Sequence, residues 1–405
     1  MTEPQQFDVC VVGAGPVGGT MACVLATAGI RVAVIDRAPL PPMEHPDFDG
    51  RAYAIAAGSR RVLERAGLWD RLPFPPGPIR DIRVSDGKVG RPASRLFLHF
   101  DSREAELDPA EPAFGWMVEA RSLRMAINTR MAELEKLAVF APATAHVTRT
   151  AASAQIRIGD GPEIAAALVI AAEGRTSKIR DEAGIRVTRL PYGQTGMVFA
   201  VAHALPHNGT ALEHFLPGGP FAQLPMAGTE GAPNLSAIVW TERDAVAKTL
   251  LAMDDVAFCR EVARRLGPHL GEIRILGRRW SYPLGALHAE RYIDTRMALA
   301  GDAAHGVHPI AGQGLNLGFQ DVGVLGDLLL EAHAAGGDLG DPALLRRYQS
   351  RRRPDVLLML AATDALDRLF STNNPLIRVA RDLGIAGVQR MPRLKRMFMR
   401  RAMGA

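Results

Sequence analysis

The stretch that decides the fold is residues 7–36, which read FDVCVVGAGPVGGTMACVLATAGIRVAVID. It opens with a short apolar run of the kind that is buried in a parallel sheet. A helix with an apolar face follows and ends near Gly29, and a second apolar run, residues 32–35, ends at Asp36. The pattern predicts a strand–helix–strand unit at the start of a parallel α/β sheet.

A glycine-rich turn, GAGPVG at residues 13–18, joins the first strand to the helix. In such a motif Gly13 permits the tight turn, Gly15 lets a pyrophosphate approach the backbone, and Gly18 lets the helix pack on the strand. An acid about 20 residues further on binds ribose hydroxyls. The turn fits FAD and NAD equally. We expect such a dinucleotide to be bound by Gly13, Ala14, Gly15, Pro16, Gly18, Asp36 and Arg37.

A second segment, GDAAHGVHPIAGQGLNLG at residues 301–318, also follows a buried apolar run. Asp302 can accept hydrogen bonds from a polyol such as a ribityl chain. The N–H groups of the helix that begins after the glycines can hold partial negative charge. A reduced flavin has both features, a ribityl chain and an anionic N1–C2=O edge. Because this segment lies nearly the whole chain away from the first motif, an extended FAD is favoured over NAD.

Further residues of this segment are expected to contact the flavin. We expect His305 and Pro309 to line it, and no catalytic residue is certain. His305 and His308 have no evident third ligand, so no metal site is predicted. The cofactor is expected to contact Asp302, Gly312, Gly314, Leu315 and Asn316.

A third signal lies between these two, LVIAAEGRTSKIR at residues 168–180. A buried strand again ends at an acid and a glycine. The three segments, in this order and spacing, resemble the aromatic-ring flavoprotein monooxygenases related to para-hydroxybenzoate hydroxylase. That superfamily usually carries Asp-Gly in the middle motif, whereas this chain has Glu173–Gly174. We therefore assign Glu173 a supporting role.

Three shorter stretches resemble the ubiquinone-biosynthesis hydroxylases within that superfamily. They are DGRAYAI at 49–55, VEARSL at 118–123 and GPFAQLP at 219–225. The resemblance extends from about Phe7 to the C-terminus. It implies that Arg51 and Arg121 lie against the flavin or its pyrophosphate.

The resemblance also implies an activity. It implies an FAD-dependent monooxygenase that hydroxylates a polyprenylated phenol in ubiquinone biosynthesis, with NADH or NADPH as transient reductant and O2 giving a C4a-hydroperoxyflavin. Two alternatives stay open: hydroxylation of another aromatic compound, and a non-catalytic flavin-binding component of a biosynthetic complex. We expect the substrate pocket to be walled by Phe199, Phe215, Phe221 and Trp240.

The strand and helix patterns predict an α/β fold with a discontinuous FAD-binding domain. This Rossmann-like domain, of the glutathione-reductase type, is assigned to residues 1–75, 110–187 and 278–345. A mainly antiparallel β substrate domain is assigned to the inserted residues 76–109 and 188–277, which carry β-type patterns and turn residues. C-terminal helices are assigned to residues 346–405.

The composition is that of a globular protein. The chain has 405 residues, of which 47% are hydrophobic and 22% charged. The three cysteines show no metal-binding spacing and no disulfide framework, so we interpret them as small core residues. No secretory signal or membrane-spanning stretch is evident, so a cytoplasmic location is expected.

The net charge of +5 comes from the C-terminal tail. Without six basic residues after Asp382, the chain has 42 basic and 43 acidic residues, and nothing indicates nucleic-acid binding. Leu394, Met397 and Phe398 follow helical spacing in this tail. Two interpretations stay open: the tail packs on the domain, or it contacts anionic lipid at the inner membrane face. Association with other quinone-biosynthesis enzymes is a further expectation. The six basic residues are Arg390, Arg393, Lys395, Arg396, Arg400 and Arg401.

Overall fold

The apolar run that opens the chain forms β1 (Gln5–Val12), an interior strand of a parallel sheet. The computed structural model describes residues 4–40, 49–87, 89–90, 97–105, 113–308 and 312–370. In spatial order the sheet is β17 (Ile293–Asp294), β18 (Met297–Leu299), β11 (Glu163–Ala171), β1, β2 (Val32–Ile35) and β8 (Leu137–Phe140). The pairs β18–β11, β11–β1, β1–β2 and β2–β8 are parallel. Two antiparallel strands extend it at β11, β10 (Ala154–Ile158) and β9 (Ala145–Arg149).

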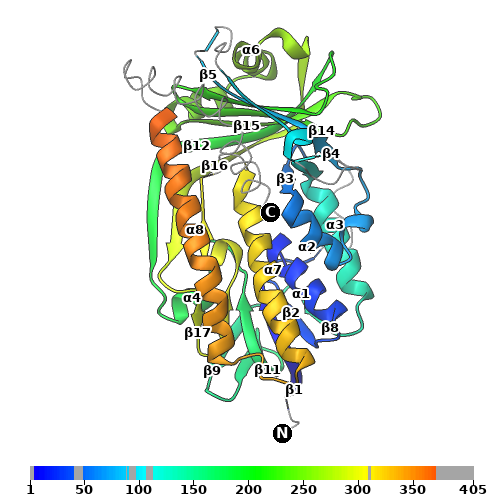
Figure 1. Ribbon diagram of the computed structural model, residues 1–405, viewed down its shortest axis with the longest axis vertical. Helices are drawn as coiled ribbons and strands as arrows, with labels where there is room; N and C mark the ends of the chain where they lie inside the picture. The colour runs from blue at the N-terminus through cyan, green and yellow to red at the C-terminus, as the bar shows by residue number, and fades with distance from the viewer. Residues whose placement is uncertain are drawn as a thin grey trace.

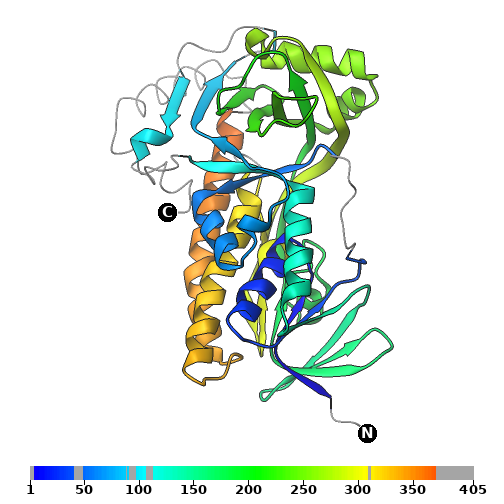
Figure 2. The same cartoon turned by 90° about the vertical axis from the view of Figure 1, so that its right-hand side faces the viewer.

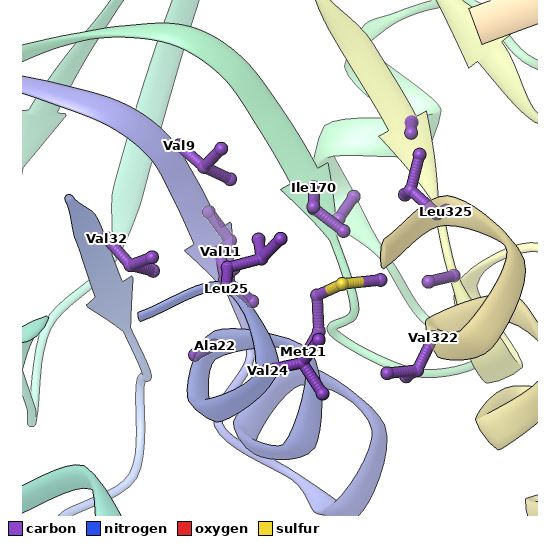
Figure 3. Close-up of a cluster of buried hydrophobic side chains, with 14 of the residues drawn as sticks. Val9, Val11, Met21, Ala22, Val24, Leu25, Val32, Ile170, Val322 and Leu325 are labelled. Carbon is purple, nitrogen blue, oxygen red and sulfur yellow. The ribbon is translucent and has the colours of Figure 1, made fainter. Parts of the chain in front are cut away.

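Helix α1 (Pro16–Thr27) covers one face of this sheet and carries the glycine turn at its start. Its Met21 side chain points toward α7 (Gln313–Ala334), and its Leu25 side chain points toward β1 (Figure 3). Both side chains are fully buried. Gly29 ends the helix with a positive φ of 89°, as the sequence predicted. The large apolar core of the molecule lies here.

A second sheet forms a roof above the first (Figure 1). All its strand pairs are antiparallel except β13–β5, which is parallel. Its outer face packs against α5 (Asp244–Leu251) and α6 (Asp255–Leu266). In spatial order the strands are β19 (His305–Gly306), β16 (Ile273–Ala289), β12 (Val187–His203), β15 (Leu235–Arg243), β14 (Gly219–Met226), β13 (Thr210–Leu216), β5 (Asp81–Asp86) and β6 (Phe97–Asp101).

A small third sheet and the remaining helices join the two large sheets. The third sheet contains β3 (Ala52–Ala56), β7 (Gly115–Glu119) and β4 (Gly77–Ile79). The long helix α8 (Pro342–Phe370) packs beside α7 and extends from β17 to β14 of the roof (Figures 1 and 2). The other helices are α2 (Ala57–Arg65), α3 (Ala120–Glu133) and α4 (Lys178–Glu182), with short 3-10 turns at η1 (Trp69–Arg71), η2 (Ser102–Ala105), η3 (Pro268–Leu270) and η4 (Gly301–Ala303).

The α/β fold class predicted from the sequence is confirmed. The division into domains at the predicted residue numbers stays a prediction, although the strands at 187–289 do lie in the roof. Of the three cysteines predicted to be core residues, Cys10 and Cys23 are buried, and burial raises the pKa of each thiol to about 12, whereas Cys259 on α6 is only partly buried. Within the described ranges, no helix is long and apolar enough to cross a lipid bilayer. The tail after residue 370 lies outside these ranges.

Candidate functional site

A cavity of about 1530 Å³ lies between the parallel sheet and the roof. On one side it is lined by residues at the carboxyl ends of β1, β2, β11 and β18 and by the start of α7. On the other side it is lined by the inner face of the roof. The carboxyl edge of a parallel sheet is where open α/β folds bind their ligands.

The glycines of the first turn are required for different reasons. A Cβ added to Gly13, whose φ is +103°, would lie 2.4 Å from the Ala172 carbonyl oxygen, and one added to Gly18 would lie 1.8 Å from the Gly13 oxygen. Gly15 has an ordinary φ of −62°, and a Cβ there would meet nothing within 4 Å. Since Gly15 lines the cavity, the space kept clear by its missing side chain is space for a ligand at the start of α1.

The Asp36 side chain holds this turn from the end of β2. Its Oδ2 accepts a hydrogen bond from the Ala14 N–H at 2.6 Å, and its Oδ1 accepts one from the Ala38 N–H at 2.8 Å. Asp36 and Arg37 both line the cavity. The Arg124 guanidinium donates to the Ala14 carbonyl at 2.9 Å, a contact that was not predicted because Arg124 lies just beyond the VEARSL stretch.

The turn after β18 presents Asp302 to the same cavity. Gly301 adopts a left-handed φ of +59°, and the Asp302 side chain is exposed to the cavity rather than packed in the core. Its setting deep between the layers raises the pKa of its carboxyl above the ordinary value, while Arg175 and His305 partly oppose that rise. An accessible acceptor in a poorly hydrated place is well suited to hydrogen bonds from ligand hydroxyls.

A buried network lies directly beneath this turn. Asp321 on α7 accepts hydrogen bonds from Gly301 N–H at 2.9 Å and from Arg352 Nε at 2.7 Å, and its Oδ2 lies 2.6 Å from His305 Nε2. Burial opposes ionisation of Asp321, but His305 and Arg352 outweigh it and lower the pKa of its carboxyl. The side chain of His305, which the sequence predicted to line the flavin, is 1% exposed, belongs to this network and is not among the residues that line the cavity.

The start of α7 forms the next part of the wall. Gly312, at the helix N-cap with a left-handed φ of 63°, lines the cavity together with Gly314 and Leu315. Asn316 also lines it, but its amide is occupied: it accepts from Ala56 N–H at 2.9 Å and donates to the Ala54 and Gly312 carbonyls. Asn316 thus fixes α7 against β3. The predicted flavin contact Pro309 lies outside the described residues.

The middle motif supports the site from β11. Glu173 Oε2 accepts hydrogen bonds from Ser177 Oγ at 2.5 Å and from Ile179 N–H at 3.2 Å, which holds the start of α4. From α4 the fully buried Arg180 donates to the Ala303 carbonyl at 3.1 Å. The motif therefore ties β11 to the Asp302 turn, in keeping with a supporting role for Glu173.

The comparison with known families fits this geometry. The model of the FAD binding domain family matches residues 6–363. The chain belongs to the FAD binding domain family. Ubiquinone hydroxylase UbiL of Rhodospirillum rubrum is 48% identical to this chain over 398 residues, which is 98% of this chain and 89% of UbiL. The 3-demethoxyubiquinol 3-hydroxylase of Escherichia coli is 32% identical over 403 residues, 99% of each protein.

A solved structure shows the same fold. The p-nitrophenol 4-monooxygenase PnpA from Pseudomonas putida superposes with a TM-score of 0.77 at 19% identity, covering 98% of this chain and 97% of that one. The described residues fit the FAD that this family binds. Two helix N-termini, those of α1 and α7, open onto the cavity, and each has a glycine there. A Cβ added to Gly15 would meet nothing within 4 Å, and one added to Gly314 would meet only Val307 Cγ2 at 4.0 Å.

The two arginines implied by the family resemblance each form an ion pair with a nearby acid. Arg51 forms an ion pair with Asp49 at 2.6 Å and lies over the Trp280 ring. Arg121 forms one with Glu119 at 2.6 Å and lies over the Phe74 ring. Neither is among the residues that line the cavity, and their contact with the flavin or its pyrophosphate stays a prediction.

Three of the four roof aromatics that the sequence predicted as pocket walls lie on the face of the roof that packs against α6. Phe215 does line the cavity, but Phe199, Phe221 and Trp240 are fully buried in the core beneath α6. Side chains alternate between the faces of a strand, so a one-residue step moves a side chain to the other side. The cavity walls are instead their smaller neighbours, Val198, Pro220, Ala222, Val239 and Thr241.

Proposed function

We propose that this protein is an FAD-dependent monooxygenase that hydroxylates the aromatic ring of a polyprenylated phenol in ubiquinone biosynthesis. The observation that carries the proposal is that one continuous cavity is lined both by the residues predicted to bind FAD and by the inner face of the roof. The names of the UbiL and E. coli relatives support this substrate class.

Bound FAD, reduced by NADH or NADPH, supplies the activation of O2 and the insertion of one oxygen atom into the ring. The protein's part is to bind, orient and exclude water. The N-terminus of α1, with Gly15, suits the pyrophosphate, Asp36 the ribose, and Asp302 the ribityl chain. The N-terminus of α7 directs partial positive charge toward an anionic flavin edge.

The chamber under the roof is suited to an apolar substrate. Its walls are mostly aliphatic and aromatic side chains from the roof, and helix α8 closes it with Leu358, Met359 and Ala362. Such walls favour burial of a prenyl chain and keep water away from the reacting oxygen. The roof residues include Ile82, Val84, Leu98, Phe100 and Leu224.

The test is an assay of the purified protein with FAD, NADH or NADPH and O2. We expect a prenylated phenol to accelerate oxidation of the reductant and to gain one oxygen atom by mass spectrometry. Coupled hydroxylation of para-hydroxybenzoate but not of the prenylphenol would favour the alternative of another aromatic substrate. Tight FAD binding without any product would favour the non-catalytic flavin-binding component.

We also propose peripheral contact with the cytoplasmic face of a membrane through the basic tail. A prenylated substrate resides in lipid, and the tail carries six basic residues after Asp382 with no acidic one. Anionic headgroups attract such a segment. Association with other quinone-biosynthesis enzymes is a further part of this proposal, and co-purification from cell membranes tests it.

A further inference from the structure

One row of side chains across the roof contains an acid among apolar neighbours. Backbone register places Leu98, Val84, Glu213, Ala222, Val239 and Val198 side by side on β6, β5, β13, β14, β15 and β12. All of them line the cavity. Along β13 itself, Ala211 and Phe215 face the same way as Glu213. The carboxyl therefore stands in a wall that is otherwise apolar.

Nothing in the described part of the chain explains this carboxyl as a structural group. Glu213 has no hydrogen-bonding or ionic partner among the described residues, unlike Glu242 of β15, which lies near Arg265. Glu213 is partly buried, and a carboxyl that is held away from bulk water without a partner is costly to folding. Desolvation raises the pKa of Glu213 to about 7, close to the pH at which an acid or base has to work.

We propose that Glu213 is the general base that accepts the phenolic proton of the substrate, a role that rests on the proposed hydroxylation of a phenol. In this step the phenol O–H bond breaks, the proton moves to a carboxylate oxygen of Glu213, and the electron pair stays on the phenolate oxygen. The phenolate donates electron density into the ring, which makes a ring carbon more reactive toward an electrophilic oxygen. The oxidant and reductant are the O2 and NAD(P)H of the proposed function.

Other titratable groups near Glu213 are few. On β5, Asp86 lies two residues beyond Val84, whereas His214 of β13 points to the opposite face and contacts Ser85. On β6, His99 pairs with Asp81. Helix α8, which packs on β14, turns only uncharged side chains to the cavity within the described residues. The FAD side of the same cavity contributes Asp36, Arg37, Tyr53, Glu173, Arg175, Lys178 and Asp302.

The first test needs no turnover. The oxidised holoenzyme is titrated with 4-nitrophenol, whose phenolate absorbs visible light, and the bound phenolate fraction is recorded between pH 5 and 9. In the wild type the ionised Glu213 carboxylate disfavours a second negative charge beside it, so the bound phenolate should appear at a higher pH than in Glu213→Gln, whose amide carries no charge. Equal spectra in the two proteins would overturn the proposal.

The second test is the pH profile of kcat/KM for hydroxylation of a phenol. The wild type should show activity rising through the pKa of Glu213, and Glu213→Gln should lose about a hundredfold to ten-thousandfold together with that rise. Glu213→Asp should recover part of the rate and keep a pH-dependent limb. An unchanged rate and profile in Glu213→Gln would contradict a base at this position.

The controls distinguish a failure of the proposed hydroxylase function from a failure of the role proposed for Glu213. Glu242→Gln changes a glutamate of the same sheet that does not line the cavity, and it should behave like the wild type in both tests. FAD content should stay equal in all variants. Failure of the wild type to hydroxylate any phenol would count against the proposed function, whereas the nitrophenol spectra decide on Glu213 alone.

Discussion

At the scale of single residues, Asp302 combines accessibility to the cavity with a raised carboxyl pKa. We expect Asp302→Ala to fold normally but to bind FAD about ten- to hundredfold more weakly, because it loses a charged acceptor worth about 1.5–3 kcal/mol. Flavin fluorescence during equilibrium dialysis measures this. Asp255→Ala, on the exposed start of α6, is the control and should retain FAD. Full retention of FAD by Asp302→Ala would remove Asp302 from the ribityl site.

The raised pKa of Glu213 predicts how the stability of the protein depends on pH, whether or not Glu213 acts in catalysis. Its pKa is about 7 in the folded protein against an ordinary value of 4.5, so between these values the folded state holds more protons than the unfolded state. The stability of the wild type therefore falls as pH rises through this window. At pH 8.5, Glu213→Gln should be more stable than the wild type by at most about 3 kcal/mol, and less where cavity water reaches the carboxyl.

Urea denaturation of both proteins at equal FAD saturation checks this prediction. At pH 4 the Glu213 carboxyl is mostly protonated in both states, so the two proteins should differ little. A stability gain of Glu213→Gln that is the same at pH 4 and pH 8.5 would mean that the substitution acts through packing instead of charge.

At the scale of elements, Asp321 couples α7 and α8 to the Asp302 turn. We expect Asp321→Asn to cost about 3–5 kcal/mol, because it leaves the buried guanidinium of Arg352 with only the exposed Asp355 as a charged partner. Thermal and urea denaturation measure the loss. Asp327→Asn on the same helix is the matched control, since its side chain is 62% exposed, and should change stability by less than about 0.5 kcal/mol. If the two variants were equally stable, the Asp321 network would not stabilise the packing of α7 and α8 against the Asp302 turn.

The strand–helix pattern predicted the elements around the FAD site well but not which way their side chains point. Continuous apolar runs assigned β1 and β2, and the apolar pattern that follows the glycine turn assigned α1. In the roof both faces are covered, one by α6 and one by the cavity, so apolarity does not distinguish them. That is why Trp240 was assigned to the pocket although it packs under α6, and why Glu213 was overlooked.

At the scale of the whole molecule, the site exists only where distant segments meet. The hydrogen bond from Ala56 N–H to Asn316 Oδ1 joins residues 260 positions apart, and the Arg180–Ala303 contact spans 123. The motifs predicted single residues of the site, such as Asn316, but not the distant residues that these contact. Arg51 and Arg121 illustrate the limit, because each has an acid two residues away with which it pairs.

The basic tail supplies the prediction that concerns the whole protein on its membrane. Six basic side chains contribute at most about 1 kcal/mol each beside an anionic leaflet, and three apolar ones at helical spacing about 1.5–3 kcal/mol each if fully inserted. These contributions suffice for reversible attachment that weakens with salt. Truncation after Gln389 should therefore reduce pelleting with anionic liposomes at low salt while FAD content and activity on a short-chain phenol persist.

High salt should partly reproduce the effect of truncation in the full-length protein, and neutral liposomes, which do not attract the basic residues, should pellet the full-length protein less than anionic ones do. Replacing the six basic residues by Gln separates charge from packing, because it keeps the length and the apolar positions of the tail. If the truncated protein loses FAD or precipitates while the Gln variant does not, the tail is a packing element of the fold. Membrane attachment would then have to be sought elsewhere on the molecule.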